Sequence, residues 1–107
     1  MKDSLLKELQ QHVASEKTYL GDGYYRIREK SEKEVELAFL LMDPCGGSVV
    51  NPQITLVKAK DNWEPVKLID LGISPTEMYE VSEETAEKLK ARLDELVGKF
   101  QGAISSN

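Results

Sequence analysis

The stretch from Val35 to Met42 constrains the fold more than any other part of the chain. Its first, third, fifth and seventh residues are Val, Leu, Phe and Leu, and alternation turns all four toward one face of a β-strand. The other face begins with Glu36 and then becomes apolar through Ala38, Leu40 and Met42. A strand that is apolar on both faces is typical of the interior of a sheet, so the rest of the chain is expected to supply its neighbours and its cover.

Three further strands are predicted beside this one. Tyr24–Glu29 alternates apolar and basic residues and forms a hairpin with the central strand through the charged turn at 30–33. Ile54–Lys60 and Val66–Leu71 follow, separated by a turn at 61–62. Because the connections are short, the four strands are expected to form an antiparallel meander.

A helix is predicted at each end of this meander. The first runs from Asp3 to about Lys17, where leucines and a valine recur at spacings of three and four. The second is capped by Ser82, and residues 103–107 are expected to form a frayed tail. Its apolar stripe consists of Ala86, Leu89, Leu93, Leu96, Val97 and Phe100.

These elements predict a single α+β domain over residues 1–107. The domain has two layers, a four-stranded antiparallel meander and the N- and C-terminal helices, which pack on one face of the sheet. The main alternative is a chaperone-like arrangement in which a helix is inserted among the strands, because the pattern of residues 72–80 is ambiguous.

Composition argues against several classes of function. With 40% hydrophobic and 31% charged residues, the chain resembles an ordinary soluble globular protein. A net charge of −5 disfavours nucleic acid, and no apolar run approaches the roughly 20 residues that span a bilayer. Cys45 is the only cysteine, so no internal disulfide can form, which favours a cytoplasmic location.

The meander predicts where a functional site would lie. Alternate connections of a meander meet at the same end of the sheet, so the turn at 21–23, the Asp43–Pro52 loop and the segment 72–80 should share one end. The middle loop is long for a hairpin, and long loops in compact domains are enriched for function. The candidate binding residues at this end are Asp22, Asp43, Cys45, Gly46, Gly47, Asn51 and Glu77.

No catalytic residue, metal or cofactor is predicted from this group. A reactive Cys45 needs a base, and His12 is the only histidine, at least two turns from the end of its predicted helix. Asp22, Asp43 and Glu77 offer oxygen ligands for a hard cation, but their spacing matches no known calcium loop. One cysteine and one histidine cannot supply a zinc pattern.

Binding to a protein remains the favoured function. The second face of the sheet carries Leu40 and Met42, which two helices on the other face cannot cover, and Trp63 in a turn and Tyr24 at a strand start are expected to be exposed aromatics. We therefore expect a small acidic, non-enzymatic interaction or regulatory domain that binds a protein partner or a second copy of itself as a homodimer. Alternatively, residues 43–53 fold over this face.

The alternative function is a small thiol-dependent enzyme or a small-ligand-binding domain with its site at the Asp43–Pro52 loop. The glycines and serine that follow Cys45 offer free backbone N–H groups to hold a thiolate or an oxyanion. Fast alkylation of a thiol with a low pKa would favour the enzyme.

Overall fold

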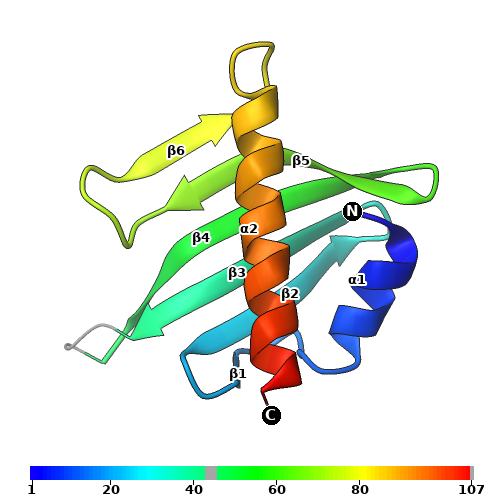
Figure 1. Cartoon of the computed structure of the whole chain (residues 1–107). Helices are drawn as coiled ribbons and strands as arrows, with labels where there is room; N and C mark the ends of the chain where they lie inside the picture. Colours follow the sequence, from blue (N-terminus) through cyan, green and yellow to red (C-terminus); the bar gives the residue numbers. More distant parts are fainter. Residues whose placement is uncertain (43–45, 107) are drawn as a thin grey trace.

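The computed structural model describes residues 1–42 and 46–106, and this part of the chain contains two helices and six strands. Figure 1 shows the six strands as one sheet with α2 lying across it. The elements, in chain order, are α1 (Asp3–Gln10), β1 (Thr18–Tyr19), β2 (Tyr24–Ser31), β3 (Glu34–Met42), β4 (Ser48–Ala59), β5 (Asn62–Asp70), β6 (Glu77–Glu80) and α2 (Ala86–Ser105).

The sheet is the predicted antiparallel meander, with β1 to β6 in sequential order. The prediction of four strands was too low, because one short strand is added at each edge. Thr18 and Tyr19 pair with Tyr25 and Tyr24 to form β1, and residues 77–80 pair with the end of β5 to form β6. Residues 77–80 are therefore a strand, and the alternative with a helix inserted among the strands is wrong.

Two strands also begin earlier than predicted, and each contains a proline. β4 starts at Ser48 and passes through Pro52, so the second half of the predicted Asp43–Pro52 loop is in fact strand. β5 starts at Asn62 and passes through Pro65. Both prolines lie where the register of the ladder shifts. Proline is tolerated at such bulges, because a ladder N–H is not required there.

The helices keep their predicted order but differ in length. α1 ends at Gln10, and the chain beyond it still contributes Val13 to the core, 3% exposed. At α2, the Ser82 hydroxyl accepts a hydrogen bond from the Thr85 N–H, but the helix itself begins at Ala86. α2 continues through Ser105, so residues 103–105 are helical rather than frayed.

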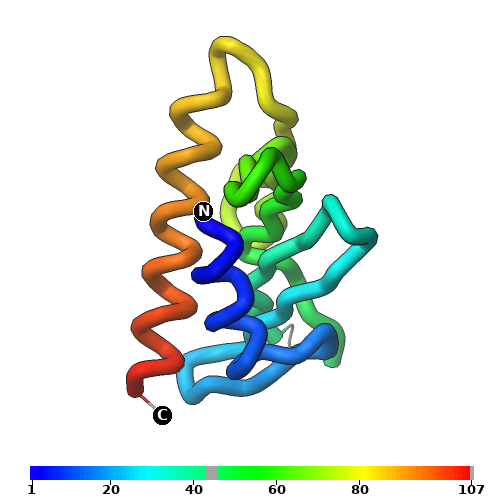
Figure 2. Tube along the Cα trace, turned by 90° about the vertical axis from the view of Figure 1, so that its right-hand side faces the viewer, coloured from blue at the N-terminus to red at the C-terminus, as the bar shows by residue number. Residues whose placement is uncertain are grey.

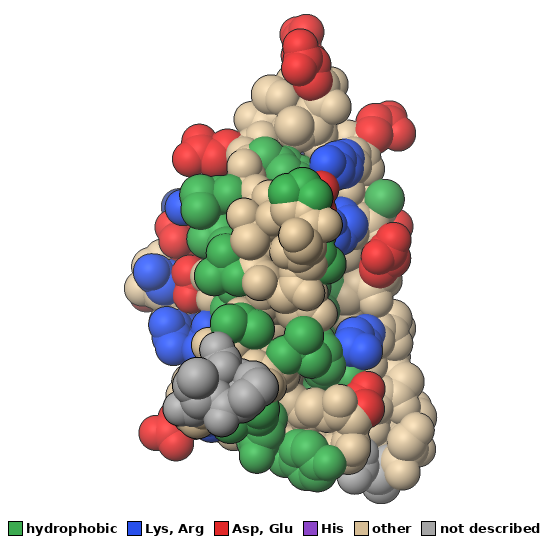
Figure 3. Space-filling model, turned by 90° about the vertical axis from the view of Figure 1, so that its left-hand side faces the viewer, with side chains coloured by type: hydrophobic (Ala, Val, Ile, Leu, Met, Phe, Trp, Pro, Cys, Tyr) green, Lys and Arg blue, Asp and Glu red, His purple; other side chains and the backbone are tan. Residues whose placement is uncertain are grey.

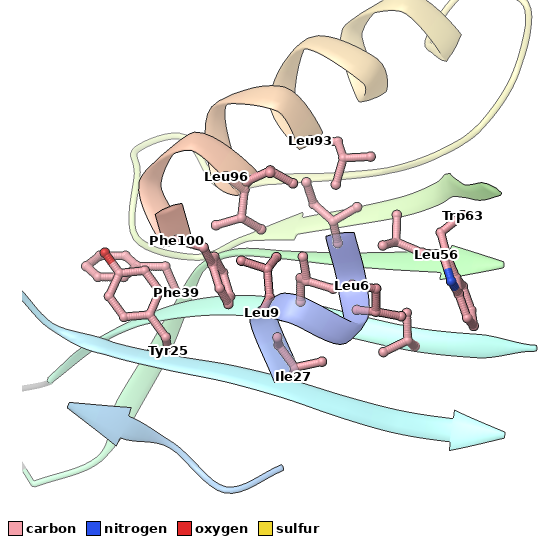
Figure 4. Packing of buried hydrophobic residues seen from close by; sticks show 14 of the residues in the cluster. Leu6, Leu9, Tyr25, Ile27, Phe39, Leu56, Trp63, Leu93, Leu96 and Phe100 are labelled. Atoms are coloured by element: carbon pink, nitrogen blue, oxygen red, sulfur yellow. The ribbon is translucent and has the colours of Figure 1, made fainter. Parts of the chain in front are cut away.

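Both helices pack on the same face of the sheet, as predicted, and Figure 2 shows them together as one layer beside it. The residues of β2 to β5 that point toward the helices form the core with the apolar stripes of α1 and α2. At one end of this core, the centroid of the Tyr25 ring lies 5.0 Å from that of the Phe39 ring and 4.9 Å from that of the Phe100 ring (Figure 4). Phe39 is thus part of the core that the central strand was expected to organise.

Candidate interaction surface

The helices leave one face of the sheet without a covering layer, and we call it the open face. Side chains alternate along each strand, so the residues between the core positions point to this face. The pairing of the strands arranges them in rows across the sheet. One row consists of Arg26, Ala38, Gln53, Ile69 and Met78.

The half of the open face over β2, β3 and β4 is covered by its own polar side chains. Arg26 and Gln53 pair with Ala38 from opposite sides, and the Arg26 guanidinium donates a hydrogen bond of 2.7 Å to the Gln53 side chain. This bond spans β3 directly above Ala38, which is fully buried and small enough to pass beneath it. Burial lowers the pKa of Arg26, and the like charge of Arg28 lowers it further, against the opposing effect of Glu36.

Glu36 is the second polar residue held on this half. It is 8% exposed, and its carboxylate oxygens lie 3.9 Å from an Arg28 nitrogen and 3.8 Å from the Lys30 ammonium. The carboxylate also accepts a hydrogen bond of 3.5 Å from the Gln53 amide. The cation-rich strand β2 and the buried carboxylate on β3 therefore form one network across the strands.

Three of the predicted interface residues are not free surface residues. Leu40 is 2% exposed, because Tyr24 and Val50 flank it on the same face of the sheet. Trp63 is 5% exposed and belongs to β5, not to a turn, and its indole N–H donates to the Asp3 carboxylate at 3.0 Å. Tyr24 is half-buried, with its ring 5.2 Å from the Tyr19 ring. The predicted exposure of Leu40 and Trp63 was wrong.

Exposed apolar side chains lie instead at the strand ends and at the β6 edge. Met42 is 48% exposed, Leu71 46% and Met78 67%. We call these residues, with Leu41 and Ile73, the apolar margin. Met42 pairs with Ser48 on β4, and Met78 pairs with Ile69, two residues before Leu71. Figure 3 shows hydrophobic side chains along this side of the molecule, with other side chains and backbone between them. Of the predicted interface residues, Met42 alone belongs to it.

The outer edge of β6 borders this margin. The Val81 N–H donates to the Val66 carbonyl at 2.8 Å, so by the alternation of an antiparallel ladder Met78 and Glu80 direct their backbone groups outward. The Thr85 hydroxyl donates to the Glu80 carbonyl at 2.6 Å. One outward acceptor of this edge is therefore already occupied.

The predicted functional loop has a structural role where the structure describes it. Asp43 and Cys45 lie outside the described residues, and Gly46 and Gly47 are exposed. Asn51 belongs to β4, and its amide donates a hydrogen bond of 2.7 Å to Asp70. Asn51 therefore ties β4 to the end of β5. The alternative in which residues 43–53 fold over the open face does not hold for 48–53, which are a strand of the sheet.

Asp70 is the centre of a charged cluster beneath the N-terminal half of α2. It is 1% exposed, and Arg92 donates to it at 2.6 Å. Arg92 also donates to Glu77, whose carboxylate lies 3.0 Å from the Lys88 ammonium. The hydrogen bond from Lys88, helped by Arg92, lowers the pKa of Glu77 against the effect of burial. Glu77 thus joins α2 to β6 and is not a free ligand.

Asp22 lies far from this cluster. It accepts a hydrogen bond from the Tyr25 hydroxyl at 3.0 Å and lies 3.7 Å from the Lys99 ammonium. Three strands separate β2 from β6, so Asp22 and Glu77 do not meet. Within the described ranges, no group of three histidine, cysteine or acidic side chains is arranged to hold a metal ion. Asp22 and Lys99 line a shallow pocket of about 440 Å³, and His12 lines a smaller one of about 150 Å³.

Sequence reasoning missed the residues that define the surface. Alternation along β2 placed Arg26 and Arg28 on one face, which was a usable signal. The sequence contained no such signal for Gln53, because β4 was predicted to start after it. It contained none for Met78 either, because the four residues of β6 show no apolar alternation.

Comparison of the chain with protein-family models, with curated proteins and with solved structures found no match. In the part of the chain that the structure describes, neither helix combines the length and apolar character needed to cross a membrane. The geometry of the surface is therefore the basis for a functional assignment.

Proposed function

We propose that this chain is a small, non-enzymatic protein–protein interaction domain that docks its partner on the apolar margin of the open face. The observation that carries the proposal is the exposure of Met42, Leu71 and Met78 together on one side of the sheet. Large contiguous apolar patches are uncommon on monomeric proteins and mark interaction sites, and methionine is enriched in protein interfaces.

The chemistry of this surface favours a protein over other ligands. The margin consists of side chains spread along strand ends and a sheet edge, which suits a broad partner surface. The acidic chain disfavours nucleic acid. Polar side chains on β2 and β4 border the margin, as a polar rim borders the apolar centre of a typical interface. A cytoplasmic setting is proposed with it, since the chain has a single cysteine.

The test compares two surface substitutions of the same kind. Met78→Lys places a charge in the margin, and Tyr19→Lys places one at the opposite edge of the sheet, where the side chain is 60% exposed. The wild-type chain is used to capture binding proteins from its native host. Each captured protein, including untagged copies of the chain itself, is then purified and its dissociation constant for all three chains is measured.

We expect Met78→Lys to weaken binding by about tenfold or more, because the ammonium group must be desolvated within an apolar contact. Tyr19→Lys should leave the dissociation constant unchanged. Equal binding of the purified partner to the wild-type chain and Met78→Lys would refute the proposal.

A further inference from the structure

One row of side chains across the open face has an unusual order of charges. Arg28, Glu36, Thr55, Lys67 and Glu80 are successive Cα partners on β2, β3, β4, β5 and β6. Their charges read positive, negative, neutral, positive and negative. Positions at equal distance from Thr55 on its two sides therefore carry opposite charges: Arg28 and Glu80 form one such pair, and Glu36 and Lys67 form the other. A surface with this property is complementary to a copy of itself.

We propose that the partner of the open face is a second copy of this chain, related by a two-fold axis that runs parallel to the strands above β4. This inference rests on the proposed function and names its partner. Such an axis lays β2 over the partner's β6 and β3 over the partner's β5. Arg28 then faces the partner's Glu80, and Glu36 faces the partner's Lys67. Thr55 meets its own copy on the axis.

The neighbouring row agrees with the same axis. Ala38 faces the partner's Ile69, and the aliphatic part of Arg26 faces the partner's Met78. A rotation about an axis parallel to the strands places each end of one sheet over the same end of the partner's sheet. The apolar strand ends of the two copies therefore meet, and Leu71 of one copy lies over β3 near Met42 of the other.

Other two-fold arrangements lose these matches. An axis in the plane of the sheet but perpendicular to the strands lays β2 over β2, which brings the cationic strand with Arg26, Arg28 and Lys30 against its own copy. Pairing of the two β6 edges is opposed by Thr85, whose hydroxyl already occupies the Glu80 carbonyl. The row from Arg28 to Glu80 therefore favours the face-to-face arrangement and its axis, whereas the row of Glu34, Val57 and Glu64 places Glu34 opposite the partner's Glu64 at one end of the contact.

The area is adequate for such a dimer. Strands β2 to β5 are at least eight residues long and β6 has four, so at a spacing of about 4.8 Å the five strands give a flat footprint of roughly 450 Å². Projecting side chains make the accessible area larger than this footprint, toward the roughly 800 Å² per partner of a standard interface. Sheets that pack face to face also tolerate a rotation of about 30°, which accommodates their twist.

The test exchanges charges between two chains. Arg28→Glu creates repulsion with the partner's Glu80, and Glu80→Arg creates repulsion with the partner's Arg28, in each case at both symmetry-related contacts. When the two variants are mixed, the heterodimer places the substituted carboxylate against the substituted guanidinium. Within one chain, three strands separate positions 28 and 80, so rescue on mixing can only be intermolecular.

We expect the wild-type chain to dimerise in sedimentation equilibrium at micromolar concentration. Each variant alone should dimerise at least about tenfold more weakly, and the equimolar mixture should recover the wild-type dissociation constant. Lys33→Glu and Glu83→Arg make the same charge changes at exposed positions outside the rows and serve as controls that leave dimerisation unchanged. Circular dichroism verifies that each variant is folded, since Arg28 also contacts Glu36.

Three results would overturn the inference. A wild-type chain that stays monomeric excludes the second copy, while the measurement with purified partners still decides the proposed function. A dimer that is insensitive to both single substitutions lies on another surface. If each variant dimerises weakly alone and the mixture also dimerises weakly, the proposed axis is wrong.

Discussion

The guanidinium of Arg92, near the middle of α2, donates a hydrogen bond of 2.6 Å to the carboxylate of Asp70, a side chain at the end of β5 that is only 1% exposed. Asp70 also accepts hydrogen bonds from the Asn51 side chain and from the Gly72 N–H. One buried carboxylate thus holds the helix, β4 and the β5–β6 turn together. The position of the apolar margin depends on this contact, because Leu71 and Ile73 follow Asp70 in the chain.

Arg92→Met is expected to lower the free energy of unfolding by about 3–5 kcal/mol, because it leaves Asp70 buried without its cation. Urea denaturation followed by circular dichroism measures the change. Lys90→Met, at an exposed position on the same helix, is the control and should change the unfolding free energy by less than about 0.5 kcal/mol. Equal stability of the two variants would show that the pair does not hold α2 to the sheet.

Stability is expected to fall on acidification, in part through Glu77. Its pKa in the folded protein lies below the ordinary value of 4.5, because Lys88 and Arg92 stabilise the carboxylate. A lowered folded-state pKa gives a contribution that is fully present above the unfolded-state value and is lost as the pH falls through the folded-state value. In urea titrations at a series of pH values, Glu77→Gln should therefore lose less stability below about pH 4.5 than the wild-type chain does.

The control for this titration is Glu87→Gln, which removes an exposed carboxylate from α2, the helix that carries Lys88 and Arg92. Its stability should follow the wild-type dependence on pH. If Glu77→Gln and the wild-type chain lose stability in parallel throughout the acidic range, the contacts of Glu77 with Lys88 and Arg92 do not stabilise the fold.

Truncation of a core side chain, in the sheet or in α2, should strongly lower the free energy of unfolding. Phe39→Ala is expected to cost about 3–5 kcal/mol and Leu93→Ala about 2–5 kcal/mol, because each leaves a cavity between the sheet and α2. Both side chains are 4% exposed. Thermal unfolding provides the measurement, and an unchanged melting temperature in Phe39→Ala would contradict its role in the core.

Two glycine substitutions should act in opposite directions. A Cβ at Gly23 would lie 2.5 Å from the Phe39 ring, so Gly23→Ala forces the core apart and should cost about 1–3 kcal/mol. A Cβ at Gly98 meets nothing within 4 Å, and Gly98→Ala in the middle of α2 should stabilise by roughly 0.5–1 kcal/mol. Urea midpoints of the two variants give the comparison, and a loss of stability in Gly98→Ala would contradict this account of the helix.

The sequence predicted the parts of the fold that have a regular period. The β2–β3 hairpin, α2 and the packing of both helices on one face follow from alternation and from the helical repeat of leucines. β1 and β6 are two and four residues long, too short for a pattern to appear. Pro52 was assigned to a loop and Pro65 to the connection before the fourth strand, although both lie at bulges within strands.

The surface was harder to predict than the fold. Alternation indicates which face a side chain points to, but not whether its neighbours on that face cover it. Leu40 was predicted to be exposed and is buried between Tyr24 and Val50. Met78 is the most exposed member of the apolar margin, but it was not predicted to lie in the interface. Its position depends on the pairing of β6 with β5 across a turn, which places Met78 beside Ile69.

The hydrogen bond from the Thr85 hydroxyl to the Glu80 carbonyl also determines how far an assembly can grow. An unprotected strand edge is a template on which further chains can add without limit, whereas contact between two faces related by a two-fold axis is complete after one copy. By occupying an outward acceptor of β6, Thr85 makes this edge a poor template. In the proposed dimer, a single hydroxyl group would thereby favour a closed pair of chains over a fibre.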